Sequence, residues 1–292
     1  MSRGFVILGI DTDRDRLKHA YALACSIKLC DMDQQVCLIV DQNKSDLVPK
    51  KYLEAFDYLV ELSFGNTAYK DGFHGANLWQ MRSCSPFEET IYVDDDTLFL
   101  NVDVDLLWDQ FEDRDIAISN IAKTYRNTYA DKTFDFEIEK IYDLPELYGN
   151  LIYFKTDSKL AIEWFKMADP CFQNWKEFYS QNFKEKKPNS FDKNVIVNTI
   201  TDALDIYYDV KTDVAVLIDL SPFAQKFYSD DISDNWTDYL NFWFTQDLQL
   251  IVENSFISSG IVHYRDEQFL TDEILDVIVS KFKINKQRKD AA

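Results

Sequence analysis

Residues 91–100 read Ile-Tyr-Val-Asp-Asp-Asp-Thr-Leu-Phe-Leu, so three consecutive carboxylates stand between two short apolar runs. The apolar residues predict a buried strand, and the carboxylates lie where that strand emerges. Side chains alternate along a strand, which places Asp94 and Asp96 on one side and Asp95 on the other. Unpaired carboxylates this close repel one another, and a bound cation would relieve the repulsion.

This acidic stretch allows two interpretations. It is either an acidic turn that caps a strand, or a site where two oxygen ligands on one side hold Mg²⁺ or Mn²⁺ against a diphosphate. The apolar run before it and the apolar residues 97–100 after it favour the metal site.

Strands and helices alternate along the rest of the chain. Short apolar runs predict strands at residues 5–10, 36–40, 58–62, 90–93, 115–119, 151–154 and 214–218. Helical spacing predicts helices at residues 15–29, 49–56, 76–84, 105–111, 157–167, 192–204 and 271–282. This alternation predicts an α/β fold with a mostly parallel, Rossmann-like central sheet and helices on both faces.

No repeat or low-complexity linker interrupts the chain, so we expect one domain over residues 1–270, followed by a C-terminal helix and frayed basic tail over residues 271–292. Ligands of such sheets bind at the carboxyl ends of strands. Asp11 and Thr12 follow the first predicted strand, so they are expected to share one crevice with the carboxylates. Residues 120–146 are polar, irregular and rich in tyrosine, and they predict a mobile loop or an insertion over that crevice.

Charge and cysteine content narrow the function classes. The 292 residues include 31 basic and 51 acidic ones, and the formal net charge of −20 disfavours non-specific binding to nucleic acid or anionic membranes. A local basic patch is compatible with that total. The five cysteines form no CxxC pair, which indicates thiols of a reducing compartment. With no signal peptide and no apolar run of about 20 residues, we expect a cytoplasmic protein without a membrane span.

Residues 91–100 resemble the DxD motif of the GT-A nucleotide-sugar glycosyltransferases, in which an apolar strand leads into Asp-x-Asp and a second apolar strand. The nearest resemblance is to glycosyltransferase family 8, the glycogenin-like and lipopolysaccharide sugar transferases, over residues 74–100, 4–60 and 144–200. Residues 85–90 are also similar to uncharacterised glycosyltransferase-like proteins of T4-type phages. The resemblance implies a GT-A domain that transfers a sugar from a nucleotide diphosphate donor, with a UDP-sugar favoured, to an acceptor hydroxyl with retention.

The same resemblance implies a metal centre. Asp94, Asp96 and His263 would hold Mn²⁺ or Mg²⁺. Asp95 would face the ribose of the donor. The family's Lys after the His is absent from this chain, and Arg265 would take over the neutralisation of the diphosphate. Neutral imidazole is a common ligand of divalent cations, although a single His after an apolar run also fits a structural role.

The chain departs from the family at three positions near these residues. The family has a Gly and a Lys after the His, where this chain has Asp266 and Phe269. At the family's basic position on the helix before the DxD strand, this chain has Leu78 beside Asn77. Arg82, one turn later, is the nearest cation and would contact the diphosphate; the alternative is a solvated charge on a helix face.

The remaining candidates would contact the nucleoside and the sugar. Asp11 and Thr12 would contact the nucleobase and ribose, or else begin the following helix as a cap. Asn150 lies in a segment similar to the one beside the donor sugar, and it would contact the sugar or acceptor or else hold a turn. Asp192 resembles the Asp of an Asp-Gln pair near the sugar, with Lys193 in place of Gln; the alternative is an N-cap.

Other functions stay open at this point. The acceptor is expected to be a saccharide, a protein or a small molecule, whereas the phage resemblance allows hydroxymethylated DNA bases flipped out of the duplex. Nucleotidyltransferases share the paired Asp but usually carry a Gly-rich phosphate loop, and the seven glycines of this chain form no such loop. A catalytically inactive sugar-nucleotide-binding module would also fit the departures from the family.

Overall fold

The computed structural model of the chain describes residues 2–10, 16–67, 74–132, 136–206, 215–222, 224–225 and 236–291. Its centre is a six-stranded sheet in the order β3-β2-β1-β4-β8-β6. The strands from β3 to β4 are parallel, and β8 runs antiparallel to both of its neighbours. This arrangement confirms the predicted mostly parallel α/β sheet. The six strands are β1 (Arg3–Leu8), β2 (Val36–Val40), β3 (Tyr58–Glu61), β4 (Glu89–Val93), β6 (Ile116–Ser119) and β8 (Tyr148–Lys155).

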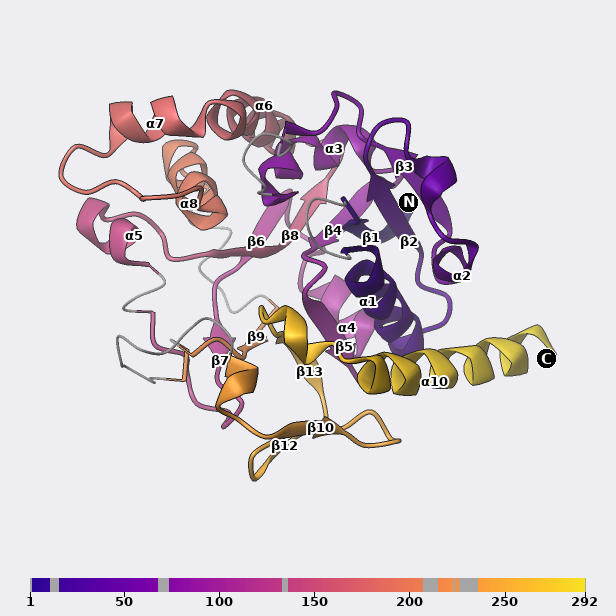
Figure 1. Cartoon of the computed structure of the whole chain (residues 1–292). Coiled ribbons are helices and arrows are strands. Elements are labelled where there is room, and N and C mark those ends of the chain that lie inside the picture. The colour runs from indigo at the N-terminus through magenta and orange to yellow at the C-terminus, as the bar shows by residue number, and fades with distance from the viewer. Residues whose placement is uncertain are drawn as a thin grey trace.

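Helices connect these strands and cover the sheet (Figure 1). The α-helices are α1 (Arg16–Cys30), α2 (Lys50–Leu53), α3 (Met81–Cys84), α4 (Val104–Asp109), α5 (Glu137–Tyr142), α6 (Lys159–Gln173), α7 (Trp175–Asn182), α8 (Lys193–Ala203) and α10 (Asp272–Asp290). The short 3-10 helices are η1 (Ser45–Leu47), η3 (His74–Gln80), η4 (Trp236–Asp238) and η5 (Glu267–Phe269).

The two faces of the central sheet carry separate hydrophobic cores. Phe5 and Ile7 of β1 belong to the core that includes α1 and α10, whereas Val6 and Leu8 belong to the core that includes α6 and α8. Figure 1 shows these helix pairs on opposite sides of the sheet. Because both faces are covered, the central parts of strands such as β1 and β2 are apolar on both faces. Each fully buried large apolar side chain stabilises the fold by about 1.5–3 kcal/mol.

A second sheet joins the C-terminal third of the chain to the acidic motif. Its order is β5-β13-β9-β7. β13 runs antiparallel to β5, and this pairs His263 with Thr97. The backbone N–H of Tyr264 donates to the carbonyl of Asp96 at 3.0 Å. The strands of this sheet are β5 (Thr97–Leu100), β7 (Ala122–Lys123), β9 (Leu217–Asp219) and β13 (Gly260–His263).

Two expectations about irregular segments differ from the structure. Residues 120–146 contain β7 and α5, and Phe136 within them is buried. These elements are too short for periodicity to predict them. The basic end of the chain is helical as far as Asp290, where a frayed tail was expected. Lys286 Nζ donates to the carbonyl of Glu54 at 2.7 Å, and this contact helps to hold the end of α10 in place.

A third sheet was not predicted at all. It is antiparallel and has the order β10-β11-β12. Each of its strands has three residues, so alternation along any one of them covers too few positions to be recognised. The strands are β10 (Phe242–Phe244), β11 (Leu250–Val252) and β12 (Ser255–Ile257).

Candidate active site

The three carboxylates of the motif occupy a turn between two sheets. β4 ends at Val93 in the central sheet, and β5 begins at Thr97 in the second sheet. Alternation along one continuous strand therefore does not set the directions of these side chains; the turn does. One ligand atom each of Asp94, Asp96 and His263 lies within 4.8 Å of the others. We refer to these three residues as the ligand cluster.

Asp94 is held by three donors. Its Oδ1 accepts from the hydroxyl of Tyr92 at 2.5 Å. Its Oδ2 accepts from Asn150 Nδ2 at 2.7 Å and forms an ion pair with Lys193. Burial, and next the charge of Asp94, raises the pKa of Tyr92 well above its ordinary value, so the phenol remains a hydrogen-bond donor. The orientation of Asp94 is therefore fixed before any ligand arrives.

Asp96 and His263 form the other side of the cluster. Asp96 Oδ1 lies 3.3 Å from His263 Nε2, and Asn150 Nδ2 lies 3.0 Å from the same nitrogen. Burial by itself would raise the pKa of Asp96, but the nearby positive charge of His263 outweighs it and holds that pKa well below its usual range. Burial would lower the pKa of His263, but the charges of Asp96 and Asp219 outweigh it and raise that pKa.

The ligand cluster fits a divalent cation. Two carboxylates and an imidazole are ligands that Mn²⁺ and Mg²⁺ sites use. Asp96 Oδ1 is buried and, among the residues that the structure describes, accepts no hydrogen bond; its contact with His263 Nε2 at 3.3 Å is an ion pair. A buried acceptor of this kind is costly unless another group satisfies it, and a cation would do so. The chemistry of these residues therefore supports the predicted metal centre.

Asp219, which the sequence analysis missed, lies behind His263. β9 is parallel to β13 and pairs Asp219 with His263, and Asp219 Oδ2 lies 4.0 Å from His263 Nδ1. The Asp219 side chain is fully buried, and it accepts from Ser221 N at 2.8 Å and from Arg265 Nη2 at 2.8 Å. Arg265, expected at the diphosphate, thus forms an ion pair with Asp219. A carboxylate behind a metal-binding His can orient the ring by accepting its N–H, and Asp219 lies on that side of His263, although 4.0 Å is too long for a hydrogen bond.

The backbone at both ends of β13 places its last residue beside the acidic turn. Gly260 begins the strand at φ +140°, a backbone conformation that favours glycine, and a Cβ there would also lie 2.6 Å from Ile218 Cδ1 of β9. Arg265 follows the strand in the left-handed region at φ 56°. Asp266 N then donates to the carbonyl of Tyr264 at 2.5 Å. The chain therefore turns sharply as soon as β13 has passed the cluster.

Asp95 forms an ion pair outside the ligand cluster. Its Oδ1 lies 3.0 Å from Arg16 Nη1, and the two side chains are 0% and 7% exposed. Arg16 also lies 3.5 Å from Glu267 Oε1. Arg16 is the first residue of α1 and was missed by the sequence analysis, because a single cation after an acidic segment gives no periodic signal. The contact of Asp95 with a ribose stays a prediction.

Two of the departures from the family pattern have structural roles. Asp266 caps η5, where its Oδ1 accepts from Gln268 N at 3.0 Å. Its Oδ2 accepts from Thr237 Oγ1 at 2.6 Å. Phe269 is fully buried, and its ring centroid lies 4.7 Å from that of Tyr264. Position 269 therefore contributes an aromatic core residue where the family has a cation.

The nucleoside candidates are only partly placed by the structure. Asp11 and Thr12 lie outside the described residues. Asn77 is fully buried, and its Nδ2 donates to Asn66 Oδ1 at 2.9 Å while its Oδ1 accepts from Thr67 N at 2.9 Å. Asn77 thus ties η3 to the turn that follows β3, which is a structural role.

Arg82 is not brought to the ligand cluster. Its Nε donates to the carbonyl of Thr156 at 2.9 Å. Thr156 lies beside the amino end of β4, because β8 runs antiparallel to that strand, whereas Asp94 follows the carboxyl end. A strand rises about 3.3 Å per residue, so the length of β4 separates these two ends by roughly 17 Å. This geometry favours the structural alternative for Arg82.

The two catalytic candidates lie on neighbouring elements. Asn150, near the start of β8, contacts both Asp94 and His263. Asp192 is the N-cap of α8, and its Oδ1 accepts from Asn194 N at 2.9 Å. The capping role anticipated as the alternative for Asp192 is thus present. The contacts of both residues with a sugar stay predictions.

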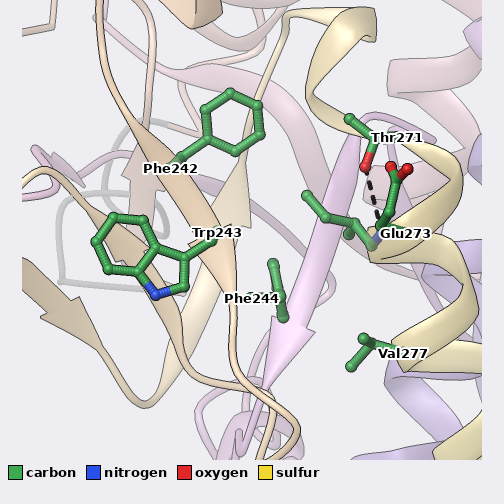
Figure 2. A pocket seen from close by; sticks show the side chains of 7 residues that line it. Phe242, Trp243, Phe244, Thr271, Glu273 and Val277 are labelled. Atoms are coloured by element: carbon green, nitrogen blue, oxygen red, sulfur yellow. Dashed lines mark hydrogen bonds between the residues drawn. The ribbon is translucent and has the colours of Figure 1, made fainter.

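Two pockets lie along α10 and are formed by other residues than the ligand cluster. The first has a volume of about 250 Å³, and the second has one of about 500 Å³. Figure 2 shows the first pocket, where the aromatic side chains of β10 lie beside the first turns of α10. It is lined by Phe242, Trp243, Phe244, Thr271, Glu273, Ile274 and Val277. Among the described residues, the group of three possible metal ligands lies at the acidic turn and not in these pockets, so the chemistry points to the acidic turn.

The structure is similar to solved GT-A glycosyltransferases. Galactosyltransferase LgtC in complex with donor and acceptor sugar analogs has a TM-score of 0.52 at 12% identity, covering 95% of each chain. An active-site mutant of LgtC has a TM-score of 0.50 at 11% identity, covering 95% of this chain and 94% of that one. Mouse xyloside xylosyltransferase 1 in its apo form has a TM-score of 0.48 at 8% identity, covering 79% and 92%. No protein-family model and no curated protein matches the sequence.

The two LgtC structures confirm the predicted GT-A fold. The fold and the ligand cluster together define the class: a GT-A domain with a candidate divalent-metal centre at the carboxyl end of β4. Within the described ranges, no helix combines the length and the apolar character that crossing a bilayer requires.

Proposed function

We propose that this chain is a metal-dependent glycosyltransferase that transfers a sugar from a nucleotide diphosphate donor to an acceptor hydroxyl. The observation that carries the proposal is the convergence of Asp94, Asp96 and His263 at the carboxyl end of β4 in a GT-A fold. Sheets of this kind bind their ligands at that edge. The resemblance to family 8 favours a UDP-sugar as donor and retention of the anomeric configuration.

The chain's own groups prepare the ligand cluster for this chemistry. Mn²⁺ or Mg²⁺ held there would supply Lewis acidity and neutralise the departing diphosphate. Tyr92 and Asn150 hold the carboxylate of Asp94 in place through hydrogen bonds. Asp219 lies behind His263, and its carboxylate, 4.0 Å from Nδ1, places a negative charge beside the ring. Preorganised ligands of this kind reduce the reorganisation needed when the donor binds.

Asn150 and Asp192 are the proposed contacts with the donor sugar or the acceptor. Asn150 supports this assignment, because its amide already lies between a carboxylate and the imidazole of the cluster. Asp192 is the N-cap of α8, and Lys193, the first residue of that helix, forms an ion pair with Asp94. For the nucleoside we propose Asp11 and Thr12, which follow β1, together with Asp95.

The proposed acceptor is a hydroxyl of a saccharide, a protein or a small molecule. With a formal net charge of −20, the chain is poorly suited to grip the phosphate backbone of duplex DNA. All five cysteines are free thiols, which supports a reducing compartment such as the cytoplasm.

Release of UDP from a panel of UDP-sugars, with Mn²⁺ and with EDTA, tests the proposal. We expect turnover of at least one donor in Mn²⁺ and loss of that turnover in EDTA. Asp109→Asn, at an exposed carboxylate on α4, is a control that should keep the activity. Turnover at the full rate in EDTA would contradict metal dependence. Failure of every nucleotide sugar to bind and to react would contradict the glycosyltransferase assignment.

A further inference from the structure

A lysine ammonium lies against the ligand cluster. Lys193 is the first residue of α8 and follows the N-cap Asp192. Its Nζ forms an ion pair with Asp94 Oδ2, and the side chains of Lys193 and Asp94 are 13% and 8% exposed. Salt screens a partly buried pair much less than an exposed one, so this contact is stronger than a surface ion pair.

The position of the lysine side chain is fixed by its surroundings. A Cβ at Gly149 would lie 3.4 Å from Lys193 Cε, and a Cβ at Gly75 would lie 3.6 Å from Lys193 Cδ, so the stem packs against two residues without side chains. Nζ lies 5.9 Å from the centroid of the Tyr92 ring, at the outer limit of a cation–π contact. Because its stem packs against the protein, the ammonium has a defined place beside Asp94.

Each carboxylate of the acidic turn has a basic partner from elsewhere in the chain. These pairs are Asp94 with Lys193, Asp95 with Arg16 at 3.0 Å, and Asp96 with His263 at 3.3 Å. The negative charge of the turn is thus compensated by the protein itself. A divalent cation that binds here approaches a resident group of the same sign, and like charges repel.

Lys193 and His263, the basic partners of Asp94 and Asp96, differ in whether they can bind a cation. An imidazole that gives up its proton becomes a ligand, whereas an ammonium has three donors and no lone pair. We propose that Lys193 is a resident counter-ion of the metal site. It holds Asp94 in the free protein and leaves that carboxylate when a divalent cation binds, so it weakens the binding of the cation. This inference rests on the proposed metal-dependent function.

Titration of Mn²⁺ alone into metal-free protein, followed by calorimetry, tests the inference without any turnover. Lys193→Gln and Lys193→Met remove the charge, and each should bind Mn²⁺ roughly tenfold more tightly than the unaltered chain, because both the competing pair and the repulsion are lost. Lys193→Arg keeps the charge and should bind as weakly as the unaltered chain. Lys187→Met, at an exposed lysine in the loop before α8, makes the same change in net charge and should alter the affinity by less than about twofold.

The outcomes separate this inference from the proposed function. Unchanged or weaker Mn²⁺ binding by either neutral variant that circular dichroism shows to be folded would overturn the role of Lys193, and Mn²⁺-dependent turnover by the unaltered chain would still support the function. Tighter binding by both neutral variants would support the counter-ion role. If no nucleotide sugar reacted in that case, the function would be contradicted while the counter-ion role stood. Absence of Mn²⁺ binding in all variants would overturn both.

Discussion

The two parts of the ligand cluster differ in how clearly the sequence predicts them. The β4–β5 part is local: apolar runs flank three consecutive carboxylates, and the motif is visible in ten residues. The β9–β13 part supplies His263 and Asp219 from strands of four and three residues. Its contacts with the acidic turn join residues as much as 169 positions apart. Some residues of the site are therefore predictable from a local motif, whereas others depend on the pairing of strands that are far apart in the sequence.

The charges of the site show the same difference between local and remote residues. The acidic turn carries three carboxylates, and their basic partners come from the start of α1, the start of α8 and the end of β13. A buried carboxylate that loses its partner leaves an uncompensated charge, which is strongly destabilising. The local motif therefore depends on the remote elements for stability as well as for completing the metal site.

Breaking the local part should have the largest effect. Asp96→Asn keeps the shape of the side chain and removes one anionic ligand, so we expect Mn²⁺-dependent turnover to fall by roughly a thousandfold or more, the equivalent of several kcal/mol of charge stabilisation. Initial rates of UDP release at saturating Mn²⁺ measure this. Asp109→Asn should keep the full rate, and a rate within about twofold of the unaltered chain for Asp96→Asn would refute its role as a ligand.

A region that the sequence analysis did not predict as structured should control the pH dependence of stability. Burial, followed by the charges of Asp192 and Glu146, raises the pKa of Glu139 on α5 to about 7 from an ordinary value of 4.5. The protonated form is favoured on folding, so this contribution is fully present below the unfolded pKa and is lost as the pH rises through about 7. Glu139→Gln should therefore be the more stable form at about pH 8, by up to about 3 kcal/mol.

Urea unfolding of the Glu139 variant between about pH 5 and pH 8 measures this contribution. The unaltered chain should lose stability relative to Glu139→Gln across that range. Glu137→Gln, on the same helix, changes an exposed pair with Lys186 and should have little effect at any pH. A constant difference between Glu139→Gln and the unaltered chain would show that Glu139 is ionised throughout.

Breaking the remote part of the cluster should have a smaller effect than breaking the local part. His263→Gln removes the imidazole but leaves both carboxylates, so we expect Mn²⁺ affinity to fall by roughly a hundredfold. Calorimetric titration with Mn²⁺ measures the change directly. An affinity equal to that of the unaltered chain would assign His263 a purely structural role.

The smallest effect on Mn²⁺ affinity is expected at Asp219, which lies behind His263 and is not itself a proposed ligand. Asp219→Asn keeps the size of the buried side chain, removes the negative charge beside His263 and weakens the contact with Arg265, so Mn²⁺ affinity should fall by roughly tenfold. A positioning role predicts that the combined variant with His263→Gln binds no more weakly than His263→Gln by itself, because the ring that Asp219 orients is gone. Additive losses of affinity would instead indicate an effect of Asp219 on the site that does not pass through His263.

How much of the structure the sequence predicts depends on the length of each element and on whether its contacts are local. Strands such as β1 and β2 were predicted because both of their faces are buried, which makes them continuously apolar. The strands β10, β11 and β12 have three residues each and leave too short a pattern. Arg16 and Asp219 were missed because their roles depend on which strand or helix end lies beside the turn, and that is a property of tertiary pairing.

Two cases show how the sequence can indicate the chemistry of a residue without indicating its contacts. Asp94 and Asp96 were predicted to share a side through alternation along one strand, whereas they converge across a turn between two sheets. Lys193 was visible in the sequence as a departure from the family's Gln, but its reach to Asp94 depends on the docking of α8. In both cases the residue types indicated the chemistry, and the fold determined the contacts.

The most direct test of the central claim is anomalous diffraction at the manganese edge from crystals grown with Mn²⁺ and UDP. We predict an anomalous peak within bonding distance of Asp94, Asp96 and His263, with density for the diphosphate beside it and Lys193 Nζ displaced from Asp94. A crystal in which UDP is bound with no anomalous peak at these three side chains, or in which the manganese lies elsewhere, would contradict the account.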